Sequence, residues 1–347
     1  MKTVATAARV SVMTVSLALR SHPKIPAATR ERIREVARDL GYRPNPLVSA
    51  LMGQLRTVRQ RSGAVTTAIA YVVPTDLSRQ EYFDVPVYQA MFRGASRRAE
   101  ELGFKLVPFF FDIDGGEAAG RHVARVLCNR GIDGIVLSPL PNNYSTIGFD
   151  WEQFSIVSLG NNLAMPRLHR CCTDEHHSMT LALDRLFTAG YRKIGLVTNQ
   201  LLETRFGYSH SSVYTGFLWR TRGMKKLPIC LCETTPQVSA TPGLIFSRWL
   251  KRHSPDAVVG VTQNIYEWLR YSGCRPPKDV GCVQLAWHPG RSNVSGVNQW
   301  PEELGAAGMS LVVQLLHHHE TGVPRHPITM TIQGEWMQGE TVRASNM

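Results

Sequence analysis

The chain has 347 residues and a formal net charge of +12, and 43% of its residues are hydrophobic against 19% charged. This composition excludes an intrinsically disordered chain, and the length suffices for two or three domains with sizeable cores. The first ten residues lack the apolar core of a signal peptide, and no stretch of about 18 apolar residues occurs that could span a membrane. We therefore expect a cytoplasmic protein, with its seven unpatterned cysteines as free thiols.

The positive charge is concentrated at the N-terminus. Residues 1–62 contain 12 lysines and arginines against 3 acidic residues, a net charge of +9, which leaves +3 for the rest of the chain. A basic head on a near-neutral body is typical of a protein that binds nucleic acid.

Three short helices are predicted within residues 1–44. Residues 4–8 form the first, and Ser11 is a suitable N-cap for a second over residues 12–20. The third begins at Thr29 and carries apolar residues at helical spacing: Ile33, Val36, Ala37 and Leu40. Three helices joined by a tight turn and a loop predict a helix-turn-helix unit.

The second predicted helix is apolar on two sides. One side, which we expect to pack into the head, is formed by Val15, Ala18 and Leu19. The other side carries Val12, Met13 and Leu17. These three side chains pack in the head's own core, contact a protein partner, or contact thymine methyl groups in a DNA groove.

Residues 45–62 are predicted to be a hinge helix and a linker. Asn45 is an N-cap, and the proline after it suits the first helical position. About two helical turns precede the arginine-rich stretch, too few for a helix that is stable alone in water. The hinge therefore needs a partner, either another chain or DNA. The three arginines of this stretch either contact phosphates along the DNA backbone or belong to a solvated linker: Arg56, Arg59 and Arg61.

Residues 63–347 alternate apolar, strand-like runs with amphipathic helices. Fully apolar strands between helices predict parallel sheets covered on both faces, here two doubly wound α/β lobes. We place the first lobe at about 63–161 plus 290–320, and the second at about 162–289 plus 321–347. Ligands of such sheets bind at the carboxyl ends of the strands, so we expect a site in the cleft between the lobes.

The segments "VATAARVSVMTVSLALR" and "IPAATRERIREVARDLGYRPNP" resemble the head of the lactose-repressor (LacI/GalR) family of transcription regulators. Segments of the body such as "RGIDGIVLSP" and "LFTAGYRKIGLV" are similar as well, so the resemblance covers essentially the whole chain. It implies a homodimer with a core like a periplasmic binding protein and a small effector molecule in the cleft. Two head residues depart from the family pattern: Arg9 replaces a turn glycine, and Pro26 replaces a serine N-cap.

The resemblance implies that the second head helix lies in the major groove, where Val12, Met13 and Leu17 contact base edges. Leu51 falls at the position whose leucine inserts into the minor groove at the centre of the operator. The alternative is that Leu51 packs against Leu47 of its own or the partner's hinge. Contacts to the DNA backbone are expected from Ser11, Thr14, Ser16, Arg20, Thr29, Tyr42 and Asn45.

The effector candidates are strand-end residues: Tyr71, Asp112, Ser138, Asn161, Asp174, Asn199, Asn264, Trp287 and Gln299. Asp174 and Gln299 match the family, while a structural role such as a loop cap is the alternative for each candidate. Other family positions have lost their polar groups. An arginine position is occupied by Val213, an aspartate position by Ile265, and an acidic pair by Ala286 and Trp287. These departures argue against a standard sugar pocket, so the effector is another compound or is absent.

No metal, cofactor or catalytic activity is predicted. The histidines and cysteines of "HRCCTDEHH" (169–177) and of the histidine run 317–319 are adjacent, which is the wrong spacing for a standard zinc site. The sequence has no G-x-S-x-G, H-E-x-x-H or P-loop motif, so an enzyme is not expected.

The sequence therefore predicts a DNA-binding transcriptional regulator, namely a dimeric repressor that binds a pseudo-palindromic operator and responds to a small molecule. Two alternatives stay in the same class: an activator, or a regulator without an effector. An alternative from another class is a small-molecule binding protein whose basic head is a non-specific anchor.

Overall fold

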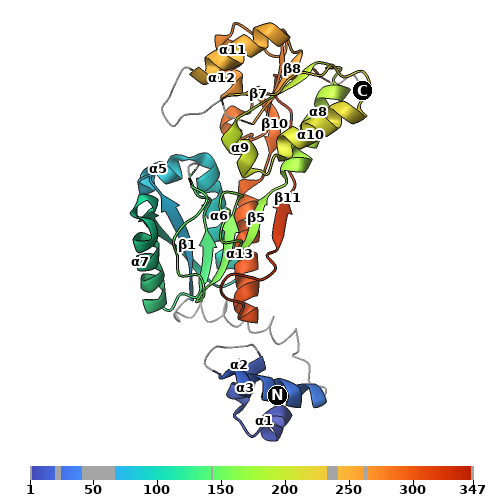
Figure 1. Cartoon of the computed structure of the whole chain (residues 1–347). Helices are drawn as coiled ribbons and strands as arrows, with labels where there is room; N and C mark the ends of the chain where they lie inside the picture. The colour runs from blue at the N-terminus through green and yellow to red at the C-terminus, as the bar shows by residue number, and fades with distance from the viewer. Residues whose placement is uncertain are drawn as a thin grey trace. The chain divides into compact units, whose positions relative to one another are not determined.

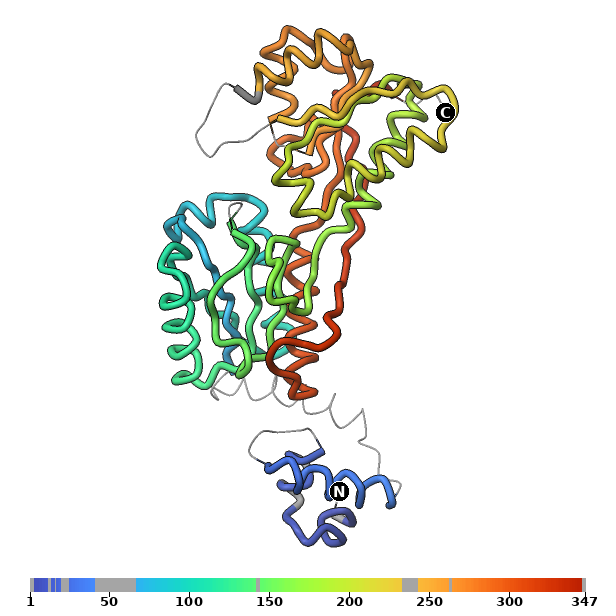
Figure 2. The backbone as a smooth tube through the Cα atoms, in the orientation of Figure 1, coloured from blue at the N-terminus to red at the C-terminus, as the bar shows by residue number. Residues whose placement is uncertain are grey.

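The computed structural model describes residues 2–19, 25–40, 67–141, 144–232, 241–261 and 264–344. The chain forms two compact units (Figures 1 and 2), Met1–Cys171 with Gly305–Thr329, and Cys172–Leu304 with Met330–Met347. Within the described ranges, no helix has the length and apolar character needed to cross a membrane.

The head is the predicted three-helix unit, with helices α1 (Lys2–Ala7), α2 (Val12–Leu19) and α3 (Ala27–Asp39). The helix α3 begins two residues before the predicted start. Arg32 of α3 donates a hydrogen bond from Nη1 to the Ala8 carbonyl at 2.9 Å, which ties α3 to the end of α1. The core of the head consists of small and branched side chains: Val4, Ala5, Ala8, Val15, Ala18, Ile33 and Ala37.

The turn between α1 and α2 is strained at Arg9, whose φ is +51°. This left-handed conformation costs a residue with a Cβ about 1–2 kcal/mol, which is why glycine suits the position. The turn is closed by backbone hydrogen bonds from Arg9 to Thr6 at 3.2 Å and from Val10 to Ala5 at 3.0 Å. At the start of α3, Pro26 is the N-cap and makes no side-chain capping bond.

The first sheet has the strand order β11-β5-β4-β3-β1-β2. Its strands are β1 (Ala68–Thr75), β2 (Lys105–Asp112), β3 (Gly134–Leu137), β4 (Ser155–Leu159), β5 (His169–Thr173) and β11 (Thr329–Ile332). The pairs from β2 through β1, β3 and β4 to β5 are parallel. The associated helices are α5 (Arg79–Asp84), α6 (Pro86–Glu101), η1 (Ile113–Gly115), α7 (Gly116–Asn129) and α13 (Pro301–His318).

The first sheet is covered on both faces. Val123 and Leu127 of α7 belong to one apolar cluster with Val72 and Ile135 of the sheet. On the other side α13 packs closely, since a Cβ on Gly134 would lie 2.7 Å from the Leu316 side chain. Burial on both faces explains why these strands are apolar at nearly every position.

The second sheet has the order β12-β10-β9-β8-β6-β7. Its strands are β6 (Ile194–Thr198), β7 (Cys230–Leu231), β8 (Ala257–Gly260), β9 (Gly281–Gln284), β10 (Ser295–Asn298) and β12 (Glu335–Met337), of which β12 pairs antiparallel to β10. Helices α8 (Glu175–Thr188) and α10 (Ser209–Arg220) contribute to one apolar cluster, and α11 (Thr241–His253) and α12 (Ile265–Tyr271) to another. Two short helices complete the unit, α9 (Gln200–Arg205) and η2 (Pro289–Arg291).

The architecture is the predicted pair of α/β lobes with a helical head. The strand membership differs from the predicted lobe bounds in three places. The strand β11 belongs to the first sheet, although residues 321–347 were assigned to the second lobe. The strand β5 belongs to the first sheet although residues from 162 were assigned to the second lobe, and β10 belongs to the second sheet although 290–320 were assigned to the first. All three strands are short, and the "SGVN" of β10 is too polar to be found by its apolar pattern.

Candidate DNA-binding face and effector-binding residues

The start of α2 is fixed by the side chain of Ser11. Its hydroxyl oxygen accepts a hydrogen bond from the Thr14 backbone N–H at 3.0 Å and lies 2.8 Å from the Thr14 hydroxyl. Ser11 is therefore the N-cap that the sequence predicts. Because the cap sets where α2 begins, it also sets which side chains face the core of the head.

The helix α2 presents different faces to the core and away from it. Val15 and Ala18 are fully buried, and Leu19 packs against them as a partly buried side chain. Leu17 is half-buried and is not part of this core, and Thr14 beside it is half-buried as well. Among the described side chains of the head, Leu17 is therefore not one of those that form its core.

Several predicted DNA contacts lie outside what the structure describes and stay predictions. These are the side chains of Val12, Met13 and Ser16, and residues Arg20, Tyr42, Asn45, Leu47, Leu51, Arg56, Arg59 and Arg61. Thr29 is described and is half-buried in the first turns of α3.

Most effector-binding candidates in the first unit are buried or make hydrogen bonds to other residues of that unit. Tyr71 has no exposed surface, and its hydroxyl lies 3.4 Å from that of Tyr82; burial raises the pKa of Tyr71 well above its usual value. Ser138 is 1% exposed. Asp112 caps the 3-10 helix η1 by accepting the Asp114 N–H at 3.0 Å. Asn161 is half-buried and follows β4.

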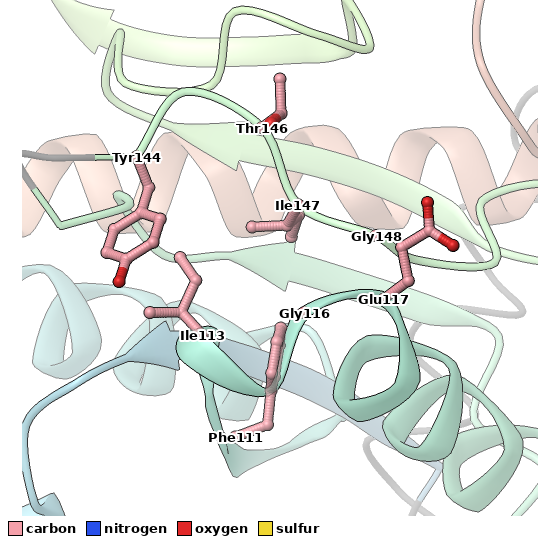
Figure 3. Close-up of a pocket in the computed structure, with 8 residues that line it drawn as sticks. All are labelled: Phe111, Ile113, Gly116, Glu117, Tyr144, Thr146, Ile147 and Gly148. Atoms are coloured by element: carbon pink, nitrogen blue, oxygen red, sulfur yellow. The ribbon is translucent and has the colours of Figure 1, made fainter.

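A pocket of about 390 Å³ lies beside Asp112 but contains none of the candidates. It is lined by Phe111, Ile113, Gly116, Glu117, Tyr144, Thr146, Ile147 and Gly148. Figure 3 shows the Tyr144 and Ile113 side chains on neighbouring segments of its wall. Two of its polar side chains already have partners, since the Tyr144 hydroxyl donates to Asp114 and Glu117 pairs with Arg121 at 2.6 Å.

Two candidates of the second unit cap helices. Asp174 accepts the His177 N–H at 2.9 Å at the start of α8, and Asn199 accepts the Leu202 N–H at 2.8 Å at the start of α9. Asn264 precedes α12 and is exposed, without a capping bond from its side chain. Helix capping, the structural alternative to effector binding, is therefore present at Asp174 and Asn199. The side chain of Asp174 is still partly exposed.

Trp287 and Gln299 differ from the caps. The indole Nε1 of Trp287 is buried and has no hydrogen-bond partner among the described atoms. Its side chain lies over β10, where a Cβ on Gly296 would meet the Trp287 Cβ at 3.0 Å. Gln299, which directly follows β10, donates from Nε2 to Oε2 of Glu175 at 3.1 Å. Gln299 is thereby joined to a buried group of charges.

That group, which we call the Glu–His–Glu cluster, consists of Glu175, His210 and Glu203. Their exposed fractions are 7%, 0% and 2%. The His210 Nε2 lies 3.0 Å from Glu175 Oε2, and its Nδ1 lies 3.6 Å from Glu203 Oε1, so the second contact is electrostatic rather than a hydrogen bond. The Thr173 hydroxyl donates to the other oxygen of Glu175, and the Thr198 hydroxyl donates to Glu203 at 3.0 Å.

The cluster holds His210 in its protonated form. Burial by itself would lower the pKa of His210, but the hydrogen bond to Glu175 and the charges of Glu175 and Glu203 outweigh it and raise the pKa to about 9. Burial would raise the pKa of Glu203, but the charge of His210 and the hydrogen bonds from the Ser211 N–H and the Thr198 hydroxyl outweigh this effect and lower it. Two carboxylates around one imidazolium leave the cluster with a net charge of −1.

The Glu–His–Glu cluster was not among the candidates from sequence. The one local signal was the pair of acidic residues Asp174 and Glu175 directly after a strand, of which only Asp174 was selected. His210 and Glu203 follow a different strand and carry no motif, so only the fold brings them to Glu175. In the described part of the chain, no three histidine, cysteine or acidic side chains are arranged to hold a metal ion.

Comparison with known proteins shows similarity to one family of bacterial regulators. Residues 1–45 match the model for bacterial regulatory proteins of the lacI family. The chain is 25% identical to the HTH-type transcriptional regulator PtxS of Pseudomonas plecoglossicida, over 90% of this chain and 88% of that protein. Two solved structures share the fold over 98% of both chains: a transcriptional regulator CelR–cellobiose complex (TM-score 0.57, 20% identity) and the lac repressor dimer bound to operator and the anti-inducer ONPF (TM-score 0.58, 16% identity).

Proposed function

We propose that this chain, a member of the lacI family of bacterial regulatory proteins, is a homodimeric repressor of transcription that acts in the cytoplasm. Each protomer contributes one head, and the two heads bind the two halves of a pseudo-palindromic operator, since a two-fold protein matches a two-fold site. The family is regulatory, and we propose no enzymatic activity for this chain.

The observation that carries the proposal is the position of Leu17 on α2. The core of the head is completed by Val15, Ala18 and Leu19, which leaves Leu17 half-buried on a different face. This face follows the Ser11 cap, at the start of the helix that enters the major groove in helix-turn-helix proteins. An apolar side chain placed there contacts thymine methyl groups and sterically excludes other bases.

Contacts to phosphates supply affinity and register. The head and hinge carry a net charge of +9, which suits counterion release from the DNA backbone. The hydroxyls of Ser11 and Thr14 lie at the start of α2, where they are available to phosphate oxygens. Leu51 from each hinge then inserts into the minor groove at the operator centre, which favours an easily unstacked pyrimidine–purine step.

The effector is a small molecule bound at the carboxyl ends of the strands. The solved CelR structure holds cellobiose, so this fold accommodates a ligand of that size. The present chain has Val213 and Ile265 where the family has charged residues, and we therefore propose a ligand other than a simple sugar. An activator, or a regulator without effector, shares the DNA-binding part of the proposal.

The experiment that tests the function is selection of bound sequences from a random double-stranded DNA pool at a fixed, near-physiological salt concentration. The expected result is a pseudo-palindrome with a pyrimidine–purine step at its centre. Binding without any preferred sequence that is lost as salt rises would overturn the proposal, because it would make the head a non-specific anchor. The core's ligand would then be the main function.

A further inference from the structure

We propose that the second lobe binds its effector through hydrogen-bond acceptors, so that the ligand carries a donor group at this end, preferably an ammonium, and is not an anion. The Glu–His–Glu cluster sets this preference, with His210 as a positioning residue that holds Glu175 in place. This inference rests on the proposed effector-regulated function and names the chemical class of its ligand.

The backbone between α9 and α10 directs His210 into the cluster. Gly207 and Tyr208 have φ values of +59° and +60°, two successive left-handed residues that turn the chain sharply. The turn is secured by a hydrogen bond from the Tyr208 N–H to the Glu203 carbonyl at 2.7 Å. His210 therefore lies in the first turn of α10 and is fully buried between Glu175 and Glu203.

The cluster fixes the orientation of the Gln299 amide. An ionised carboxylate only accepts hydrogen bonds, so the group that Gln299 turns to Glu175 must be its NH₂. The protonated His210 donates from Nε2 to that same Oε2 of Glu175 at 3.0 Å. The remaining polar atom of Gln299 is its carbonyl oxygen, an acceptor, on a side chain that is only half-buried. A ligand reaching Gln299 therefore meets an acceptor.

Asp174 adds a second acceptor at the same edge. One carboxylate oxygen caps α8 through the His177 N–H, and the side chain is half-buried, so its other oxygen can accept from a ligand. The charges at this edge favour a cation. With His210 protonated, the formal charges of Asp174, Glu175, Glu203, His210 and Arg205, the last residue of α9, sum to −1. Partial burial makes this charge act on a ligand more strongly than it would in water.

The test compares three ligands that share one six-carbon polyhydroxyl chain and differ at one end. Glucamine carries an ammonium, sorbitol a hydroxyl and gluconate a carboxylate. Thermal stabilisation of the full chain, and the Kd of each ligand by calorimetry, should rank glucamine above sorbitol and sorbitol above gluconate. We expect the glucamine and gluconate affinities to differ by about tenfold or more. Tighter binding of gluconate, equal binding of all three, or no binding of any would overturn the inference.

The variant Glu175→Gln links the preference to the cluster. It removes one charge and the acceptor-only constraint, so the amide of Gln299 is free to turn either way. The ratio of glucamine to gluconate affinity should fall about tenfold. A matched control is Glu267→Gln on α12, whose partner is the surface residue Arg291 at 3.0 Å, and which should keep the ratio. An unchanged ratio in Glu175→Gln would count against the cluster.

A second variant tests the same inference if Glu175→Gln does not fold. Gln299→Met preserves the length of a half-buried side chain and removes its acceptor together with its hydrogen bond to Glu175, so glucamine stabilisation should be lost while the chain still folds. Retained stabilisation by glucamine would contradict the role of Gln299. The DNA selection is run on the same preparations. A specific operator without charge selectivity overturns this inference alone, whereas the absence of any operator overturns the proposed function.

Discussion

The imidazole of His210 donates to the carboxylate of Glu175 across 3.0 Å, although 35 residues separate them in the chain and neither is substantially exposed. The contact joins the start of α8 to the start of α10, two helices that pack on the same apolar cluster of the second unit. A buried ion pair is costly to desolvate, so its geometry must be good and its other polar atoms must be satisfied. Here Thr173, Gln299 and Thr198 supply additional hydrogen bonds to the two carboxylates, while Nδ1 of His210 faces Glu203 Oε1 at 3.6 Å.

This pair makes stability depend on pH. The pKa of His210 is about 9 in the folded protein, against an ordinary value of 6.5. A group with a raised folded pKa contributes stability fully below the unfolded pKa, and the contribution is lost as pH rises through the folded value. Between pH 6.5 and 9 we expect the free energy of unfolding to fall by about 3 kcal/mol relative to His210→Gln.

The measurement is chemical denaturation of the wild-type chain and of His210→Gln at both pH values. The exposed residue His318 offers a control, because His318→Gln should follow the wild-type pH profile. Parallel profiles for the wild type and His210→Gln would show that His210 is not charged in the folded state.

Leu17→Arg should change which base is preferred at one position of each operator half-site. The new guanidinium donates to guanine, whereas the leucine packs against a thymine methyl group, and the discrimination should shift by about 1–3 kcal/mol. Selection from a random DNA pool measures this shift. Leu40→Arg adds the same charge at a leucine that is 48% exposed on the head, and should leave the preference unchanged. If both variants select the wild-type operator, Leu17 does not contact bases.

Leu51→Ala should weaken specific DNA binding far more than non-specific binding. The substitution removes the apolar side chain proposed to unstack the central base step, and it leaves the phosphate contacts in place. Affinities for the selected operator and for unrelated DNA, measured at the same salt concentration, give the two losses. Leu40→Ala serves as the matched truncation in the head. Equal losses on both DNAs would show that Leu51 acts on the fold of the hinge alone.

Arg9→Gly should stabilise the head. The left-handed backbone at φ +51° costs an L-residue more than glycine, and the gain is partly offset by the greater freedom of glycine in the unfolded chain. We expect a net gain of about 0.5–1 kcal/mol in the free energy of unfolding of the head. Arg9→Ala removes the same exposed side chain but keeps a Cβ, so it should show no such gain. Identical effects of the two substitutions would place the cause in the side chain.

The sequence by itself determined the elements whose signals are local. Ser11 marks the start of α2 because a cap acts on the N–H groups of the next turn, and the spacing of Ile33 and Ala37 identifies the buried side of α3. The apolar strands of both sheets were predictable for a similar reason, since burial on both faces favours a hydrophobic residue at nearly every position. The likeness of the head to the family likewise resides in contiguous residues.

Tertiary structure decided what depends on distant parts of the chain. The membership of β5 and β10 in their sheets follows from hydrogen bonds between strands far apart in sequence, which their short, partly polar sequences do not specify. Tyr71 stands at a strand position that suits a ligand, yet neighbouring helices bury it completely. The charge of His210 was also beyond the sequence, because an imidazole with an ordinary pKa of 6.5 becomes a cation at neutral pH only where the fold encloses it between two carboxylates.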